Sequence, residues 1–264
     1  MEQQMRVLQQ QQLPPEAAQL AATYQLGTPQ TEYKVGVKKS TMITMIVIGI
    51  LAGGGFGVGA LNSTSQTSTM LVLLGFSLLF IGLALYYVFL PVIYHSWHVY
   101  VCTDGFAFTR GNAIEAFRWD QIEAMWQSVT KHYTNGVYTG TTHIYTVRSR
   151  DGRKVVLNDK FANVEQLGNT ISQQITNYLL PQVVSAYNAG NTITFGPLSI
   201  SKQGVSNSKE LLPWSQIKEM GVNRGVVTVK KEGKWLSWSS VMVAKVPNIF
   251  VFMALVNYVL KSQR

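Results

Sequence analysis

Two long apolar segments dominate the pattern of this chain. Residues 40–103 contain no Lys, Arg, Asp or Glu, and within them apolar runs cover 41–61 and 69–94. The polar segment 62–68 separates the two runs. The hydrocarbon core of a bilayer is about 30 Å thick, which a helix of roughly 20 apolar residues spans. The pattern therefore predicts a transmembrane helical hairpin over residues 41–94.

The basic residues beside the hairpin predict its orientation. Lys34, Lys38 and Lys39 precede the first apolar run, whereas the connection 62–68 carries no charge. Because basic residues favour the cytoplasmic side of a membrane, we expect the N-terminus in the cytoplasm. Two spans return the chain to the same side, so the C-terminus is expected there as well. The chain is thus predicted to be a multi-pass protein of the cell membrane without a cleaved signal peptide.

Glycines in the first apolar run suggest close helix packing. Gly49, Gly53 and Gly57 stand four residues apart, as do Gly55 and Gly59, so the members of each set share a helix face. Small residues at this spacing let helices approach closely in lipid. Two interpretations stay open: packing against the second run, which the short connection favours, and homodimerisation. Neither run contains Lys, Arg, Asp, Glu or His, which disfavours a proton relay, an ion pathway or a transport site.

The segments that flank the hairpin differ in character. Residues 1–40 are rich in Gln and predict a flexible cytoplasmic tail, with a short helix around 16–24. After the second run, aromatic residues between Tyr94 and Tyr100 suit the headgroup level of a bilayer. They lead directly into a predicted strand at 99–103. The domain that follows is therefore expected close to the inner leaflet.

The rest of the chain contains a weak internal repeat. Residues 119–125 and 214–220 share the pattern Trp-x-Gln-Ile-x-x-Met, and an alternating strand that turns at a glycine precedes each. Downstream, Asp151-Gly152 and Glu232-Gly233 predict hairpin turns. The first copy also carries an additional segment, 131–140, which we expect to form a long loop.

Each copy ends in a predicted helix. Asn163 and Asn248 are the expected N-cap residues of these helices. Strands followed by a helix predict an α+β fold, in which each helix closes a curved sheet or a partly open barrel. The predicted modules cover 95–182 and 191–264. The last helix is apolar on nearly all sides but too short to span a bilayer, so it is expected to pack on its own sheet.

The pattern also carries a family resemblance. The strand and turn Thr103–Phe106, followed by a Trp-led strand, resembles bacterial pleckstrin-homology-like domains. Residues 155–163, 191–198 and 210–214, together with the tandem arrangement behind a hairpin, are similar to an uncharacterised family of bacterial membrane proteins. The resemblance covers about residues 95–264. It implies two such modules but no established activity and no catalytic residues.

Candidate catalytic chemistry is sparse. The histidines His95, His98, His132 and His143 lack a neighbouring set of metal ligands, although His132 and His143 could face each other across a hairpin. No nucleophile elbow or phosphate-binding Gly-rich loop is present. We therefore expect no enzyme activity, no cofactor and no metal site. The single cysteine, Cys102, excludes an intramolecular disulfide and fits a reducing compartment.

Charge is concentrated in the second module. Residues 95–190 hold eight Lys and Arg against seven Asp and Glu, a net charge of +1, whereas residues 191–264 hold ten against three, a net charge of +7. Basic residues near an anionic leaflet contribute about 1 kcal/mol each. One interpretation is that the second module contacts anionic lipid headgroups. The alternative is that its basic residues form a solvated surface. The candidate contacts with anionic lipid are Lys202, Lys209, Lys230, Lys231 and Lys234.

These observations give three functional hypotheses. The first is a non-enzymatic, membrane-anchored scaffold or interaction protein, with the bilayer and either a second copy or another protein as partners. The second is a binder or sensor of anionic lipid headgroups that acts through the basic second module. The third is a membrane enzyme or a transport accessory subunit. Nucleic acid is not an expected partner, because no recognition motif accompanies the charge.

Overall fold

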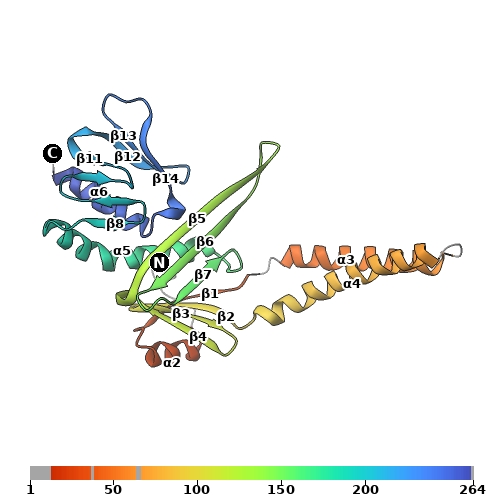
Figure 1. The fold of residues 1–264 in the computed structure, drawn as a ribbon. Coiled ribbons are helices and arrows are strands. Elements are labelled where there is room, and N and C mark those ends of the chain that lie inside the picture. Colours follow the sequence, from red (N-terminus) through yellow and green to blue (C-terminus); the bar gives the residue numbers. More distant parts are fainter. Residues whose placement is uncertain (1–12, 37–38, 64–66, 263–264) are drawn as a thin grey trace, which may run out of the picture. The chain divides into compact units, whose positions relative to one another are not determined.

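The fold is α+β, as the sequence predicts (Figure 1). A computed structural model describes residues 13–36, 39–63 and 67–262. The helices are α2 (Pro15–Thr23), α3 (Lys39–Leu61), α4 (Thr67–Tyr94), α5 (Val164–Asn188) and α6 (Ile249–Ser262), with 3-10 helices η1 (Trp119–Gln121), η2 (Trp214–Gln216) and η3 (Val243–Lys245). The first seven strands are β1 (Pro29–Lys34), β2 (Trp97–Cys102), β3 (Gly105–Arg110), β4 (Ala113–Arg118), β5 (Ile122–Thr134), β6 (Val137–Ser149) and β7 (Lys154–Asn158). The other seven are β8 (Ile193–Phe195), β9 (Leu198–Ile200), β10 (Gly204–Ser206), β11 (Leu211–Pro213), β12 (Ile217–Asn223), β13 (Val226–Lys231) and β14 (Ser237–Met242).

The chain divides into two compact units. The smaller unit consists of Lys34–His98 and Thr109–Ile114, and therefore combines the α3–α4 hairpin with the turn between β3 and β4. The larger unit runs up to Tyr33, resumes over Val99–Phe108 and continues from Glu115.

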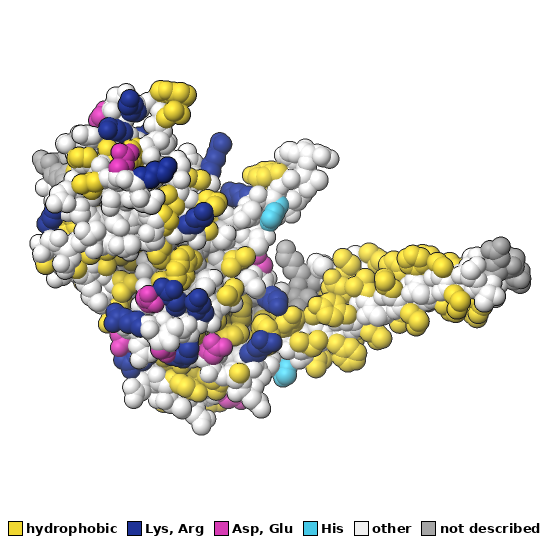
Figure 2. Space-filling view, viewed as in Figure 1, with side chains coloured by type: hydrophobic (Ala, Val, Ile, Leu, Met, Phe, Trp, Pro, Cys, Tyr) yellow, Lys and Arg dark blue, Asp and Glu magenta, His cyan; other side chains and the backbone are white. Residues whose placement is uncertain are grey.

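In the smaller unit, α3 and α4 form an antiparallel pair of apolar helices. Both are long and apolar enough to span a membrane, and only 11% of the most apolar window of each is buried within the chain. A core helix of a soluble protein would be mostly buried, whereas these helices expose apolar side chains along their length (Figure 2). The hairpin expected over 41–61 and 69–94 thus takes the form of helices over 39–61 and 67–94.

The strands of the described residues form four antiparallel sheets. Two are four-stranded, with the orders β1-β2-β3-β4 and β11-β10-β9-β8, and two are three-stranded, β5-β6-β7 and β12-β13-β14. A four-stranded sheet, a three-stranded sheet and a helix therefore follow one another twice. We call β1–β7 with α5 the first module and β8–β14 with α6 the second module. The sheets are separate and not closed into a barrel.

The N-terminal segment is part of the first module. Helix α2 and the loop after it bury Ala17, Ala21 and Leu26 against Tyr100 and Cys102 of β2. Strand β1 is the edge strand of the first sheet. The prediction of a flexible tail over residues 1–40 is therefore wrong for residues 13–36, although the short helix expected around 16–24 is present as α2. The first twelve residues of the predicted tail lie outside the described residues. The first module also begins before residue 95, because β1 precedes the hairpin.

The position of the hairpin in the chain distinguishes the two modules. In the second module, Gly196 and Pro197 alone connect β8 to β9, which pair with each other. In the first module, residues 35–96 lie between β1 and β2, and they include α3 and α4. The hairpin thus occupies the connection between the first two strands of the first module.

The two Trp-x-Gln-Ile segments adopt the same local structure. Each forms a 3-10 turn, η1 or η2, just before a long strand. The indole Nε1–H of Trp119 donates to the Thr103 carbonyl over 3.0 Å, and that of Trp214 donates to the Ser201 carbonyl over 2.9 Å. In both modules the tryptophan is therefore fixed to the turn after the second strand of the four-stranded sheet.

Helix α6 packs on the sheets of the second module, as the sequence predicts. Phe252 is fully buried, and its ring lies 5.2 Å from that of Phe195 in an edge-on arrangement. The helix residues buried in this core are Ile249, Val251, Phe252, Leu255, Val256 and Val259.

The expected N-cap asparagines take the predicted positions but do not cap with their side chains. Asn163 and Asn248 precede α5 and α6 with left-handed φ values of 56° and 52°. The side chain of Asn163 makes no capping bond. The side chain of Asn248 accepts from the Met125 N–H over 2.9 Å and donates to the Glu123 carbonyl over 3.0 Å. Asn248 therefore joins the second module to strand β5 of the first.

Candidate functional site

Two of the five candidate lysines of the second module have intramolecular partners. The Nζ of Lys230 lies 2.7 Å from Glu219 Oε2, and this bond lowers the pKa of the Glu219 carboxyl. The Nζ of Lys202 lies 4.5 Å from the centre of the Tyr187 ring. Both contacts are near the surface, where such pairs contribute little to stability. They orient these two ammonium groups without removing them from solvent.

The turns that carry Lys209 and Lys234 are held near each other. Asn207 Oδ1 accepts from the backbone N–H groups of Lys209 and Glu210, at 2.8 and 3.0 Å, and so shapes the β10–β11 turn. The Nε1–H of Trp238, on β14, donates to Glu210 Oε1 over 2.6 Å. This bond brings the start of β14, and with it the β13–β14 turn, to the β10–β11 turn.

The β13–β14 turn is the most exposed apolar feature of the second module. Trp235 is 89% exposed and Leu236 is 61% exposed, directly after Lys234. Gly233, with φ 69°, allows the chain to turn here. Apolar and basic side chains lie side by side at this end of the module (Figure 2). A tryptophan next to lysines suits the boundary between lipid headgroups and acyl chains.

The glycines of α3 do not all face the same way. A Cβ on Gly49 would lie 2.7 Å from the Ala84 Cβ of α4, and one on Gly53 would lie 2.8 Å from Ile81 Cγ1. Gly57 also faces α4, at Ser77 Oγ. In contrast, nothing lies within 4 Å of a Cβ on Gly55, and only Leu73 lies near one on Gly59. The structure therefore places Gly49, Gly53 and Gly57 against α4 and leaves Gly55 open to the surroundings.

The predicted loop at 131–140 is instead part of a long β-ribbon, so that prediction is wrong. Strands β5 and β6 pair from Ile122 and Ser149 to Thr134 and Val137, and the ribbon extends beyond β7 (Figure 1). The signal for this turn was Asn135-Gly136, both with positive φ, which is the usual sequence of a two-residue hairpin. The exposed apolar residues at the tip are Tyr133 (61%), Val137 (67%) and Tyr138 (56%).

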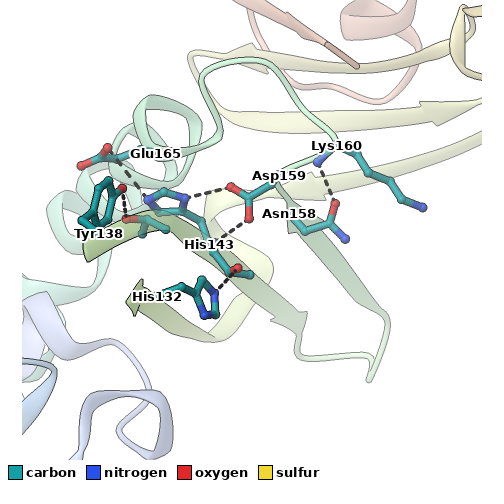
Figure 3. Close-up of polar contacts among 9 residues, drawn as sticks. His132, Tyr138, His143, Asn158, Asp159, Lys160 and Glu165 are labelled. Atoms are coloured by element: carbon teal, nitrogen blue, oxygen red, sulfur yellow. Dashed lines mark hydrogen bonds and ion pairs between the residues drawn. The ribbon is translucent and has the colours of Figure 1, made fainter. Parts of the chain in front are cut away.

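His143 lies at the base of this ribbon between two carboxylates (Figure 3). Its Nδ1 is 2.9 Å from Asp159 Oδ1, and its backbone N–H donates to Asp159 Oδ2 over 2.7 Å. Its Nε2 is 3.9 Å from Glu165 Oε2. Pairing of β6 with β7 ends at Ile144, so Asp159 caps the edge of the ladder at the next residue. This contact holds the ribbon where it leaves the sheet.

The histidines do not form the pairs that their spacing allowed. His132 lies opposite Gly140 and contacts Thr142 Oγ1 at 2.7 Å, so it does not face His143. Nδ1 of His95 and Nε2 of His98 each lie 2.8 Å from a backbone carbonyl oxygen, of Val92 and of His95 respectively. Within the described residues, no group of three or more potential metal ligands occurs.

Cys102 is fully buried in strand β2. Burial, with a smaller effect of the Asp104 carboxylate, raises the pKa of its thiol to about 11. The thiolate is the reactive form of cysteine, so this thiol is unreactive at neutral pH.

Comparison with known proteins places the whole chain in one family. The model described as "Family of unknown function (DUF6585)" matches residues 1–264. The chain belongs to this family. No curated protein and no solved structure matches this DUF6585 protein. The expectation of an uncharacterised family is confirmed. Because the DUF6585 family has no known function, the proposed function rests on the geometry of the chain.

Proposed function

We propose that this protein is a non-enzymatic, membrane-anchored interaction protein that presents two pleckstrin-homology-like modules to the cytoplasm. The observation that carries the proposal is the β5–β6 ribbon, which extends beyond its sheet and exposes Tyr133, Val137 and Tyr138 at its tip. Exposed aromatic side chains on a regular element are typical anchors of protein interfaces. The partner is another protein or a second copy of this chain.

The proposed module type is supported by the order of elements. Each module has four strands, then three strands, then a helix that packs on them. This order agrees with the resemblance of the sequence to bacterial pleckstrin-homology-like domains. The matching bonds of Trp119 and Trp214 support an origin of the two modules by duplication.

Site-specific photo-cross-linking tests the proposed interaction. A photoreactive residue is placed at Tyr138 of the full chain, and a matched control carries it at Val156, which is also exposed but lies on β7. In native membranes, the Tyr138 probe should give a discrete adduct that Tyr133→Ser with Val137→Ser abolishes. Equal adducts from both probe positions would contradict the proposal.

A second candidate function is binding of anionic lipid headgroups by the second module. The observation that favours it is the exposure of Trp235 and Leu236 beside Lys231 and Lys234. The lysines supply the attraction to anionic headgroups, and the apolar side chains supply burial at the level of the acyl chains.

An environment-sensitive fluorophore tests this candidate. Because Cys102 is buried, a single added cysteine, Trp235→Cys, can be labelled in the full chain without removing Cys102. In proteoliposomes, its emission should shift to the blue in anionic lipid but not in neutral lipid. A label at the exposed Val222 should shift in neither. Identical spectra of the Trp235 label in both lipids would exclude this function.

A further inference from the structure

We propose that the β3–β4 turn is a lipid-binding turn, in which Arg110 binds the headgroup phosphate of an anionic phospholipid beside the end of α4. The inference rests on the proposed insertion of the hairpin in a bilayer. It concerns the smaller unit only, where the turn and the hairpin are packed together.

Hydrogen bonds hold this turn against the end of α4. Ser96 follows α4, and its Oγ accepts from the Gly111 N–H over 3.1 Å. The hydroxyl of Thr109 lies 3.3 Å from the Ser96 carbonyl and accepts from the His98 N–H over 3.2 Å. Thr109 is 9% exposed, so its own bonds are partly shielded from water, whereas the Ser96–Gly111 bond is exposed. The turn therefore keeps a fixed position relative to the helix end.

The length of α4 places this end at headgroup level. Its 28 residues, Thr67–Tyr94, span about 42 Å at ~1.5 Å per residue. A bilayer with its headgroups is about 40–45 Å thick. The helix therefore reaches across the acyl chains and ends among the headgroups, and the turn bonded to it lies at the same level.

Arg110 is oriented for phosphate at this level. Its Cζ lies 4.7 Å from the centre of the Trp97 ring, and the Trp97 ring meets Tyr94 edge-on at 4.9 Å. A guanidinium held over an indole ring keeps N–H donors that can bind a phosphate. No hydrogen bond or ion pair joins this guanidinium to another residue in the part of the chain that the structure describes.

The charge of the smaller unit favours an anionic ligand. Residues 34–98 and 109–114 contain no Asp or Glu, whereas they contain Lys34, Lys38, Lys39 and Arg110. No carboxylate of this unit therefore competes for Arg110. Planar, bidentate binding of phosphate is the geometry for which Arg is best suited.

Lipid retention by the full chain tests the proposal. The wild type, Arg110→Gln and a control, Arg150→Gln at the exposed β6–β7 turn, are reconstituted in mixed phosphatidylcholine and phosphatidylglycerol. They are then washed in detergent, and the bound lipid per chain is measured by mass spectrometry. Arg110→Gln should retain about fivefold less phosphatidylglycerol, the effect of one basic residue at an anionic surface. Arg150→Gln should match the wild type, and inorganic phosphate should not displace the lipid.

The outcomes separate the lipid site from the anchor. Equal phosphatidylglycerol retention by the wild type and Arg110→Gln overturns the site, as does displacement of the lipid by inorganic phosphate. Release of the wild type from membranes by alkaline carbonate overturns both the anchor and the site. If Arg110→Gln does not fold, Arg110→Lys decides, because it keeps the charge but loses the planar fork. Phosphatidylglycerol retention by Arg110→Lys should fall between that of the wild type and that of a chain without bound lipid. Retention by Arg110→Lys equal to that of the wild type counts against bidentate binding.

Discussion

Two neighbouring glycines of α3 have opposite surroundings. Gly53 lies against α4, where Ser77 also donates to its carbonyl over 2.7 Å, whereas nothing lies within 4 Å of a Cβ on Gly54. Gly49 is tighter still, because a Cβ there would lie 2.8 Å from the backbone oxygen of Phe80. The residue type is the same at all three positions, so substitutions separate the effect of packing from that of composition.

We expect Gly49→Leu to destabilise the hairpin and Gly54→Leu not to do so. Overpacking of a tight contact costs about 1–3 kcal/mol, and here the backbone of α4 has to move. Unfolding by sodium dodecyl sulfate, followed by circular dichroism, measures the difference. Equal midpoints for the two variants would show that α3 and α4 are not packed in this register.

Asp151 makes the β6–β7 turn sensitive to acid. The Ser149 hydroxyl, the Arg153 backbone N–H and the Arg153 guanidinium all donate to its carboxylate. These bonds lower its pKa to about 2, against about 3.9 in an unfolded chain. Because the folded pKa is the lower one, the stabilisation is complete above pH ~4 and is lost as the pH falls through ~2.

The predicted consequence is a pH-dependent difference between the wild type and Asp151→Asn. The wild type should have the higher thermal midpoint at neutral pH, and the difference should disappear between pH ~4 and ~2. Thermal unfolding in detergent at a series of pH values measures it. A difference that stays constant over this range would contradict the assignment of these bonds to the carboxylate.

At the scale of elements, Asn248 links the two modules. It extends the edge of β5 by bonding to Glu123 and Met125, and its own N–H donates to the Met125 carbonyl over 2.8 Å. Asn163 has the same left-handed backbone before α5 but makes no side-chain cap. Glycine tolerates this backbone, so Asn→Gly removes the side chain without introducing strain.

Asn248→Gly should therefore lower the free energy of unfolding by about 1–3 kcal/mol, because it leaves two backbone groups of β5 without these partners. Asn163→Gly should change it by only a few tenths of a kcal/mol. Urea denaturation of the detergent-solubilised chain, followed by tryptophan fluorescence, compares the two. A loss in Asn163→Gly as large as in Asn248→Gly would argue against a specific link between the modules.

Some elements could be predicted from the sequence because their signal is local. Apolar runs of membrane length predict α3 and α4, and Asp151-Gly152 predicts the β6–β7 turn. Strand β1 could not be predicted, because it is short and its partner β2 lies beyond the hairpin. The ribbon is not predicted although Asn135-Gly136 marks its turn, because its Thr- and Tyr-rich flanks lack apolar alternation.

The same distinction, between signals that are local in the sequence and contacts that depend on strand pairing, applies to the candidate site. Composition located the basic charge of the second module, but not which lysines have intramolecular partners, since the bond of Lys230 to Glu219 depends on strand register. The contact of Arg110 with Trp97 also follows from pairing of β2 with β3, which spacing alone does not show.

At the scale of the whole molecule, the hairpin is an insertion between β1 and β2. The second module connects the corresponding strands with Gly196 and Pro197 alone. The four-stranded sheet of such a module therefore forms without an inserted hairpin. The first module should therefore need β1 but not α3 and α4. The insertion would supply the anchor, and the sheets would supply the fold.

We expect a chain in which Gly-Pro replaces residues 35–96 to be soluble and folded. Circular dichroism and size-exclusion chromatography without detergent measure this. A control that begins at Trp97 lacks α2, Leu26 and β1, so it exposes Tyr100 and Cys102, and it should aggregate. Aggregation of both chains would show that the hairpin is needed for the fold of the modules.

Labelling of single cysteines in intact cells tests the central claim most directly. Cys102 is buried and unreactive, so the added cysteines Asn62→Cys, in the connection between α3 and α4, and Trp235→Cys report their own positions. A membrane-impermeant maleimide should label Asn62→Cys from outside and Trp235→Cys only after the membrane is opened. Labelling of Trp235→Cys in intact cells would contradict a hairpin that holds both modules in the cytoplasm.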